Sequence, residues 1–310
     1  MRTMPSSAES EAGPPFRTMN LDTAVQLCHA LVVSVGERLR VRTLFIKGPA
    51  AQLQGIRLPK LSADTDVLVR EDGLSTLISA LAEHGWVIRP EDPDKKYLQP
   101  HSVTMYSPNW PCDIDLHFRF PGIEADWDEA FDFLWARRET VELAHQRLSV
   151  PRSGDHLAIL LLNELRNVDT SSEFPHLRQR ALERADDVLD FVGGTGSAAP
   201  LRPVLELMPQ SAGLIYPRPS TNWRWHTRTT SDSARRIIAI VYSPWREKPA
   251  LIWHSIFAPV EVVRITDLYA DGSPRSLVVK NVQRWSRALH NLVATAREVV
   301  RYFSSRPPQY

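Results

Sequence analysis

The chain has few cysteines, no signal-like apolar segment near its start and no long apolar run. Its only cysteines are Cys28 and Cys112. They are far apart in sequence, so they form neither a disulfide framework nor a zinc-ligand pattern, and they suit a reducing compartment. No apolar segment follows Arg2 as it would in a signal peptide, and no stretch approaches the roughly 18 residues that span a bilayer. We therefore expect a cytoplasmic protein with no membrane partner.

The chain also has no surplus of charge, since 37 basic residues face 36 acidic ones. A nucleic acid is therefore not expected as a partner, which leaves only a local basic patch open. The 310 residues, 43% hydrophobic and 24% charged, are typical of a soluble globular protein with about two domains.

Two strand-like segments carry polar side chains at every second position. One contains Asp64 and Asp66, and the other contains Asp113, Asp115 and His117. Residues i and i+2 of a strand share a face, so each set points to one side, with apolar residues on the other. If the two strands are neighbours, the carboxylates converge and repel one another unless a cation lies among them. Oxygen ligands suit Mg²⁺, which also takes substrate phosphates, so the pattern favours phosphoryl or nucleotidyl transfer.

Periodicity predicts strands and helices together in the first part of the chain and mainly helices afterwards. Predicted strands cover about 41–46, 64–70, 86–89, 101–106 and 112–120, and predicted helices cover about 22–40, 49–54, 72–84, 126–137, 155–166, 177–192 and 276–303. Gly48 is a plausible N-cap for the short helix that begins at Pro49. We expect a mobile leader at 1–18, an α/β domain at 19–122 with a loop at 90–100, and a mainly helical region at 123–310.

The order of these motifs resembles the polymerase-β-like nucleotidyltransferase superfamily, and in particular its bacterial branch of uncharacterised nucleotidyltransferase-like proteins. The resemblance depends on Lys47-Gly48, on Lys60-Leu61-Ser62-Ala63-Asp64-Thr65-Asp66 and on Asp115-Leu116-His117. It covers residues 40–120 well and extends more weakly to Ile256-Phe257-Ala258-Pro259.

The resemblance implies an α+β fold, with a small mixed β-sheet flanked by helices and a mainly α-helical domain after it. It implies Mg²⁺ as cofactor, with Mn²⁺ as the alternative, and an NTP such as ATP as substrate. By resemblance, the catalytic and metal-binding residues are Asp64, Asp66 and Asp115, and the nucleotide-binding residues are Lys47, Gly48, Lys60 and His117. From the residues alone, His117 could equally be a half-buried histidine and Lys47 a surface lysine.

The leading hypothesis is a Mg²⁺-dependent nucleotidyltransferase that moves a nucleoside monophosphate to a small-molecule, peptide or protein acceptor. The alternative is a catalytically inactive nucleotide-binding, scaffold or antitoxin-like protein, because Gly48-Pro49 stands where the superfamily has Gly-Ser. The run Gly193–Ser197 lacks the ending of a phosphate-binding loop and favours a helix C-cap. Trp223, Trp225 and His226 are interleaved with Arg218, Arg224 and Arg228. This segment favours an amphipathic packing surface over base stacking. The acceptor, the base and the oligomeric state are not encoded in any motif of the chain.

Overall fold

A computed structural model describes residues 19–90, 100–166, 172–229, 231–258, 260, 263 and 273–304. The predicted leader at 1–18 lies outside the described residues, as do most of the predicted loop at 90–100 and Pro259.

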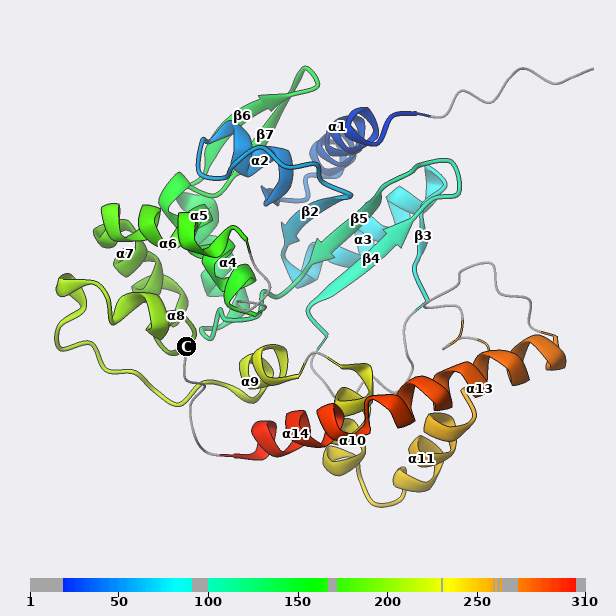
Figure 1. The fold of residues 1–310 in the computed structure, drawn as a ribbon. Helices are drawn as coiled ribbons and strands as arrows, with labels where there is room; N and C mark the ends of the chain where they lie inside the picture. Colours follow the sequence, from blue (N-terminus) through cyan, green and yellow to red (C-terminus); the bar gives the residue numbers. More distant parts are fainter. Residues whose placement is uncertain are drawn as a thin grey trace, which may run out of the picture.

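A mixed five-stranded sheet forms the centre of the α/β part (Figure 1). Its order is β1 (Thr43–Ile46), β2 (Asp64–Val69), β5 (Asp113–His117), β4 (Ser102–Tyr106) and β3 (Val87–Ile88). Strands β2 and β5 are parallel, and every other neighbouring pair is antiparallel. This sheet, together with the helices around it, confirms the predicted α+β class.

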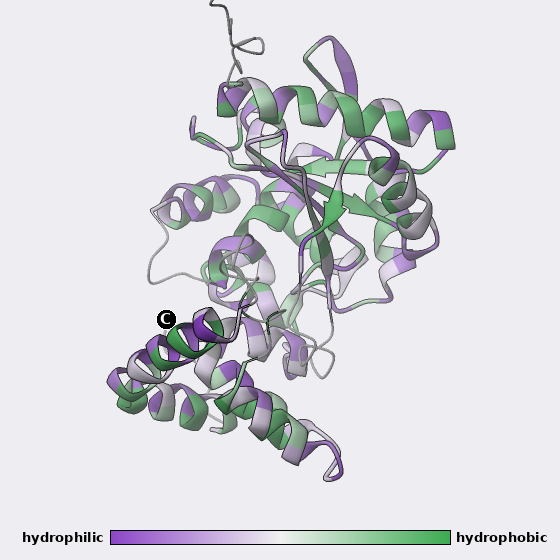
Figure 2. Cartoon of the chain, turned by 90° about the vertical axis from the view of Figure 1, so that its right-hand side faces the viewer, coloured by the Kyte–Doolittle hydropathy of each residue, from purple (hydrophilic) through white to green (hydrophobic). Residues whose placement is uncertain are grey.

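Helices cover both faces of this sheet. On one face, α1 (Leu21–Leu39) and α3 (Glu71–Glu83) share a core with Phe45, Val67 and Leu116. On the other face, α4 (Trp127–Ala136) and α5 (Ser153–Leu165) share a core with Leu44, Ile46 and Leu68. The sheet accordingly carries apolar residues on both faces, and green segments are visible within it in Figure 2.

The turn after β1 differs from its prediction in one detail. Helix α2 (Gly48–Leu53) is capped by Lys47, not by Gly48, while Pro49 lies in its first turn as expected. Gly48 has a φ of +39°, and a Cβ atom there would lie 2.8 Å from Ser62 Oγ. Lys47 also has a positive φ, 57°, which is rare for a residue with a side chain.

A hairpin, β6 (Glu139–Leu143) and β7 (Gln146–Val150), follows α4 and was not predicted. Its turn places Ala144 and His145 at φ values of 49° and 59°. Two-residue hairpin turns of this kind are usually marked by Asn or Gly, which tolerate positive φ, and neither residue is present here. The hairpin packs against β1 and α1.

The described residues from 172 onward are mainly helical. Their elements are α6 (Phe174–Glu183), α7 (Ala185–Thr195), α8 (Ala198–Leu205), the short 3₁₀ helix η2 (Pro209–Ser211), α9 (Thr221–Arg228), α10 (Asp232–Tyr242), α11 (Lys248–Ile256), α13 (Pro274–His290) and α14 (Leu292–Phe303). The single helix predicted at 177–192 is wrong, because the chain breaks into two helices at Arg184, whose backbone leaves the helical region. The helix predicted at 276–303 likewise divides, at Asn291.

Two of the simpler interpretations are confirmed. Gly196 is the left-handed C-cap of α7, and Trp223 and Trp225 are buried. Helices α6, α7 and α8 pack against α5 and share one core with β1 and β2. The domain boundary at residue 122 stays a prediction. None of the helices within the described ranges is long and apolar enough to cross a bilayer.

Candidate metal centre and active site

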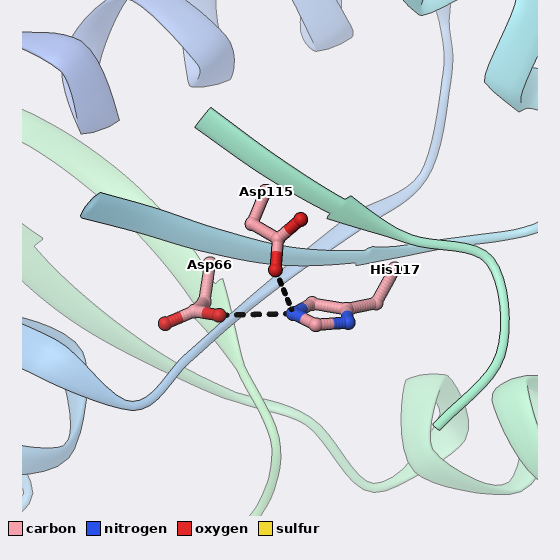
Figure 3. Close-up of side chains that lie close together, drawn as sticks. All are labelled: Asp66, Asp115 and His117. Carbon is pink, nitrogen blue, oxygen red and sulfur yellow. Dashed lines mark hydrogen bonds and ion pairs between the residues drawn. The ribbon is translucent and has the colours of Figure 1, made fainter. Parts of the chain in front are cut away.

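Two carboxylates and one imidazole meet on the α5 face of the sheet (Figure 3). Asp66 comes from β2, and Asp115 and His117 come from β5. His117 Nε2 lies 2.9 Å from Asp66 Oδ1 and 3.2 Å from Asp115 Oδ2. One potential ligand atom from each of the three side chains lies within 4.8 Å of the others.

Strand register explains the convergence. Asp66 is the direct partner of Asp115 in the parallel β2–β5 pair, and it also pairs with Ile46 of β1. Alternation then places Thr65 and Val67 on the α1 face, where Thr65 Oγ1 lies 3.0 Å from His29 Nδ1. Asp66 is therefore held on the opposite face, and its residue surface is only 4% exposed.

The negative charge of this cluster is offset by cations from the chain itself. Lys47 Nζ lies 2.7 Å from Asp66 Oδ1. Burial would raise the pKa of Asp66, but Lys47 and then His117 hold it below its ordinary value. Burial also opposes ionisation of Asp115, yet His117 lowers its pKa strongly. Burial would lower the pKa of His117, but Asp115 and Asp66 raise it. Lys47 and His117 thus keep both carboxylates in their charged form.

The spacing and chemistry of the three ligand atoms fit a divalent ion. The three ligand atoms lie within 4.8 Å of one another, which is close enough for them to share one ion. The 2.9 Å and 3.2 Å distances at His117 are those of its hydrogen bond and ion pairs with the two carboxylates. Thr104 Oγ1 donates to Asp115 Oδ1 at 3.0 Å and orients that carboxylate. Within the described part of the chain, His117 Nδ1 is buried without a hydrogen-bond partner. An imidazole beside two carboxylates suits Mn²⁺ or another transition metal better than it suits Mg²⁺.

Asp64 stands at the edge of this cluster and does not belong to it. It lies two residues before Asp66 on the same face of β2 and pairs in register with Asp113. Burial and then the charge of Asp66 raise the pKa of Asp64 to about 6. Asp113 has a different role, because Arg89 NH2 holds both of its oxygens at 2.7 Å and 2.6 Å.

A cavity of about 240 Å³ opens beside Asp64 and Asp66, and Lys47, Arg57 and Lys60 line it. Arg57 forms a two-pronged ion pair with Glu173, and Lys60 Nζ lies 4.0 Å from the same carboxylate. The lining of the cavity thus combines these three basic side chains with the carboxylates of Asp64 and Asp66. Such a lining suits an anion that is bound together with a cation.

The structure thus separates the predicted site residues into three groups. Asp66, Asp115, His117 and Lys47 are in direct contact, and Asp64 and Lys60 line the adjoining cavity. Gly48 lies in a turn with a positive φ, where a side chain would meet Ser62. Their chemical roles stay predictions.

Several residues at the site were not predicted from the sequence. Thr104 lies on the strand beside Asp115, at the position where alternation points a side chain toward it. His156 contacts the backbone of Lys47, and its only signal was a polar residue within an apolar helix. His101 stacks on His117 with ring centroids 5.9 Å apart, and His226 of α9 meets His101 edge to face at 4.9 Å. Helix α9 therefore contacts His101, the residue that stacks on His117 of β5.

Comparisons with known proteins add little. No family model matches the chain, and no curated protein matches it in sequence. Among solved structures, it is similar to the antibiotic-resistance factor ANT(2'')-Ia, whose solution structure revealed substrate-regulated conformation dynamics. That match has 12% identity and a TM-score of 0.40, and it covers 60% of this chain and 96% of the other. Likeness at this level carries no functional weight, so a function for this chain has to be argued from the geometry of its own site.

Proposed function

We propose that this protein is a divalent-metal-dependent nucleotidyltransferase that moves a nucleoside monophosphate from an NTP to a small-molecule, peptide or protein acceptor. One observation carries the proposal. Asp66, Asp115 and His117 come close enough together to hold one metal ion, and a cavity lined by Lys47 and Lys60 opens beside them. The combination suits a metal-bound polyphosphate, since both the ion and the basic side chains bind its oxygens.

Each residue then has a task that its position gives it. Asp66, Asp115 and His117 would hold the ion, and Asp64 would add a ligand from the cavity side. The ion would stabilise the attacking and leaving oxygens of an in-line displacement. Lys47 and Lys60 would offset charge on the departing pyrophosphate, and burial of the cluster strengthens these interactions by excluding water.

Incubation with ATP, GTP, CTP and UTP in Mg²⁺ or Mn²⁺, followed by a pyrophosphate assay, tests this function. Asp66→Asn is expected to lower the rate by at least about 10²-fold, because it removes a ligand charge. Asp113→Asn is the matched control, since Asp113 lies on the same face of β5 but is paired with Arg89. It should retain activity. Undiminished transfer in an Asp64→Asn/Asp66→Asn double variant would refute the assigned chemistry.

A second candidate is a nucleotide-binding module without catalysis. It is favoured by the ion pair of Lys47 with Asp66, which already offsets that carboxylate's charge within the protein. Calorimetry with ATP, with and without Mg²⁺, separates the two. Binding that needs no metal and releases no pyrophosphate would support the second candidate.

A further inference from the structure

His156 is a buried histidine of α5 that has no task in the chemistry proposed above. Its residue surface is 0% exposed. Burial and then the nearby charge of Arg57 lower its pKa to about 3, so the ring is neutral near pH 7. A neutral imidazole has one donor and one acceptor nitrogen.

Both ring nitrogens have partners, and these partners fix the tautomer. The backbone N–H of Lys47 donates to Nε2 at 2.8 Å, so Nε2 is the acceptor. Nδ1 therefore carries the proton and donates to Gln54 Oε1 at 2.5 Å. The Gln54 amide in turn donates to Pro151 O at 2.9 Å and to Glu139 Oε2 at 2.8 Å. His156 thus contacts the residues that cap both ends of α2.

The hydrogen bond to His156 holds the backbone of Lys47 in an unusual conformation. Its φ of 57° and ψ of −156° lie near a region that is almost confined to glycine, so the conformation is strained for a residue with a side chain. Strain of this kind persists only where surrounding contacts impose it. The hydrogen bond to His156 and the one from Ala51 N to Lys47 O are such contacts.

The strained conformation determines which face of the sheet the lysine reaches. Ile46 pairs with Asp66, and Phe45 belongs to the core on the α1 face. In a regular strand Lys47 would share the face of Phe45 and point away from Asp66. The reversal of φ returns its side chain to the acidic face, where Nζ lies 2.7 Å from Asp66 Oδ1.

We propose that His156 is a positioning residue that fixes the Lys47 backbone so that the Lys47 ammonium lies on the Asp66 carboxylate. The consequence for catalysis rests on the nucleotidyl-transfer function proposed above, whereas the structural relationship does not. His156 does not touch the reacting atoms; it acts through Lys47.

The first test is structural and needs no activity. Crystal structures of the wild type, His156→Leu and His156→Gln are compared at Lys47. In His156→Leu the Lys47 N–H loses its acceptor, so we expect φ to become negative and Nζ to leave Asp66. Gln offers an acceptor oxygen at a similar reach, so His156→Gln should keep both features. If Lys47 is unchanged in His156→Leu, the proposal is overturned.

The second test is kinetic. Misplacement of a working group by about 1 Å can cost 10²-fold in rate, so kcat per folded molecule should fall at least about tenfold in His156→Leu and be largely rescued in His156→Gln. Ile159→Val, a mild change to the same buried helix, controls for lost packing and should keep kcat.

If His156→Leu does not fold, Gln54→Met replaces it. Gln54 is half-buried, and its substitution should lower kcat by a smaller factor. Equal kcat in all variants would overturn the proposal. Failure of the wild type to bind any of the four NTPs in the presence of Mn²⁺ would instead refute the nucleotidyl-transfer function, and the comparison of Lys47 structures would still decide the role of His156.

Discussion

Asp66 and His117 lie on neighbouring parallel strands, two residues out of register, and their side chains meet at 2.9 Å. Direct partners across the pair, Asp66 and Asp115, would alone supply only oxygen ligands. In the proposed metal site the offset histidine would add a nitrogen ligand, and this would change the metal that the site prefers.

We therefore predict that Mn²⁺ binds more tightly than Mg²⁺ and that His117→Gln narrows this difference. Loss of a group that merely orients a metal ligand costs about 10–100-fold in affinity, so loss of the ligand should weaken Mn²⁺ binding by at least as much. Calorimetric titration of the wild type and His117→Gln with Mn²⁺ and with Mg²⁺ measures these affinities. His84→Gln, at the exposed end of α3, is the control and should bind as the wild type does. Equal Mn²⁺ affinity in His117→Gln would exclude His117 as a ligand.

Lys47→Met should make the protein more dependent on a metal. The substitution leaves the buried Asp66 carboxylate with one cation fewer, at an expected cost of about 1–3 kcal/mol without metal. A divalent ion can then offset the charge of the Asp66 carboxylate without competing with the Lys47 ammonium. Mn²⁺ should accordingly raise the melting temperature more in Lys47→Met than in the wild type, as measured by calorimetry in EDTA and in Mn²⁺.

Lys60→Met is the matched control for that experiment. The Lys60 side chain is 58% exposed and lies 4.0 Å from Glu173, so its removal should leave both melting temperatures almost unchanged. A metal-induced shift that is no larger in Lys47→Met than in Lys60→Met would show that Lys47 and the ion do not share Asp66.

Acid should destabilise the fold through His29. This ring is buried against Phe45, and burial lowers its pKa to about 4 from an ordinary value near 6.5. The unfolded chain therefore binds a proton before the folded chain does, and stability falls as pH drops from 6.5 through 4. Between pH 7.5 and pH 5 this one group should remove about 2 kcal/mol.

Urea unfolding of the wild type and His29→Gln at the two pH values isolates this contribution. The midpoint should fall by roughly 0.5–1 M more in the wild type than in the variant. Other buried groups titrate too, including His101, whose pKa is lowered by burial and by His117, but they are common to both proteins. Parallel pH dependence in the two proteins would contradict the prediction.

Gly48→Ala tests whether this glycine serves the turn. A side chain there meets both a φ of +39° and Ser62 Oγ at 2.8 Å, so we expect a loss of about 1–2 kcal/mol. Gly85→Ala isolates the backbone effect, because φ is +82° and nothing lies within 4 Å. Gly193→Ala, in helix α7 with open space, should be neutral or stabilising. Recovery of part of the loss in Gly48→Ala/Ser62→Ala would confirm the contact.

Much of the sheet could be predicted because alternation is a local property. Asp66 and Asp115 could be assigned to faces from two short segments without knowing the strand order. The role of His156 could not be predicted, because it depends on a hydrogen bond across 109 residues of sequence and on a backbone angle at Lys47. The separation of Asp64 from the cluster depends on register, since Asp66, not Asp64, is the partner of Asp115.

The helices after residue 122 were harder to predict from the sequence for a different reason. The apolar pattern at 177–192 continues through Arg184, so periodicity alone reports one helix where the backbone makes two. The β6–β7 hairpin was missed because Ala144 and His145 lack the turn chemistry that marks such positions. The strands that flank the turn pack against β1 and α1, and this tertiary packing is not visible in the local sequence.

The parallel pairing of β2 with β5 also has a consequence for synthesis. The ribosome adds about 5–20 residues each second, so β2 emerges several seconds before β5 can join it. During that interval the open edge of β2 could pair with another nascent chain. Charged side chains discourage such aggregation, and Asp64 and Asp66 on this strand would supply that protection until its partner arrives.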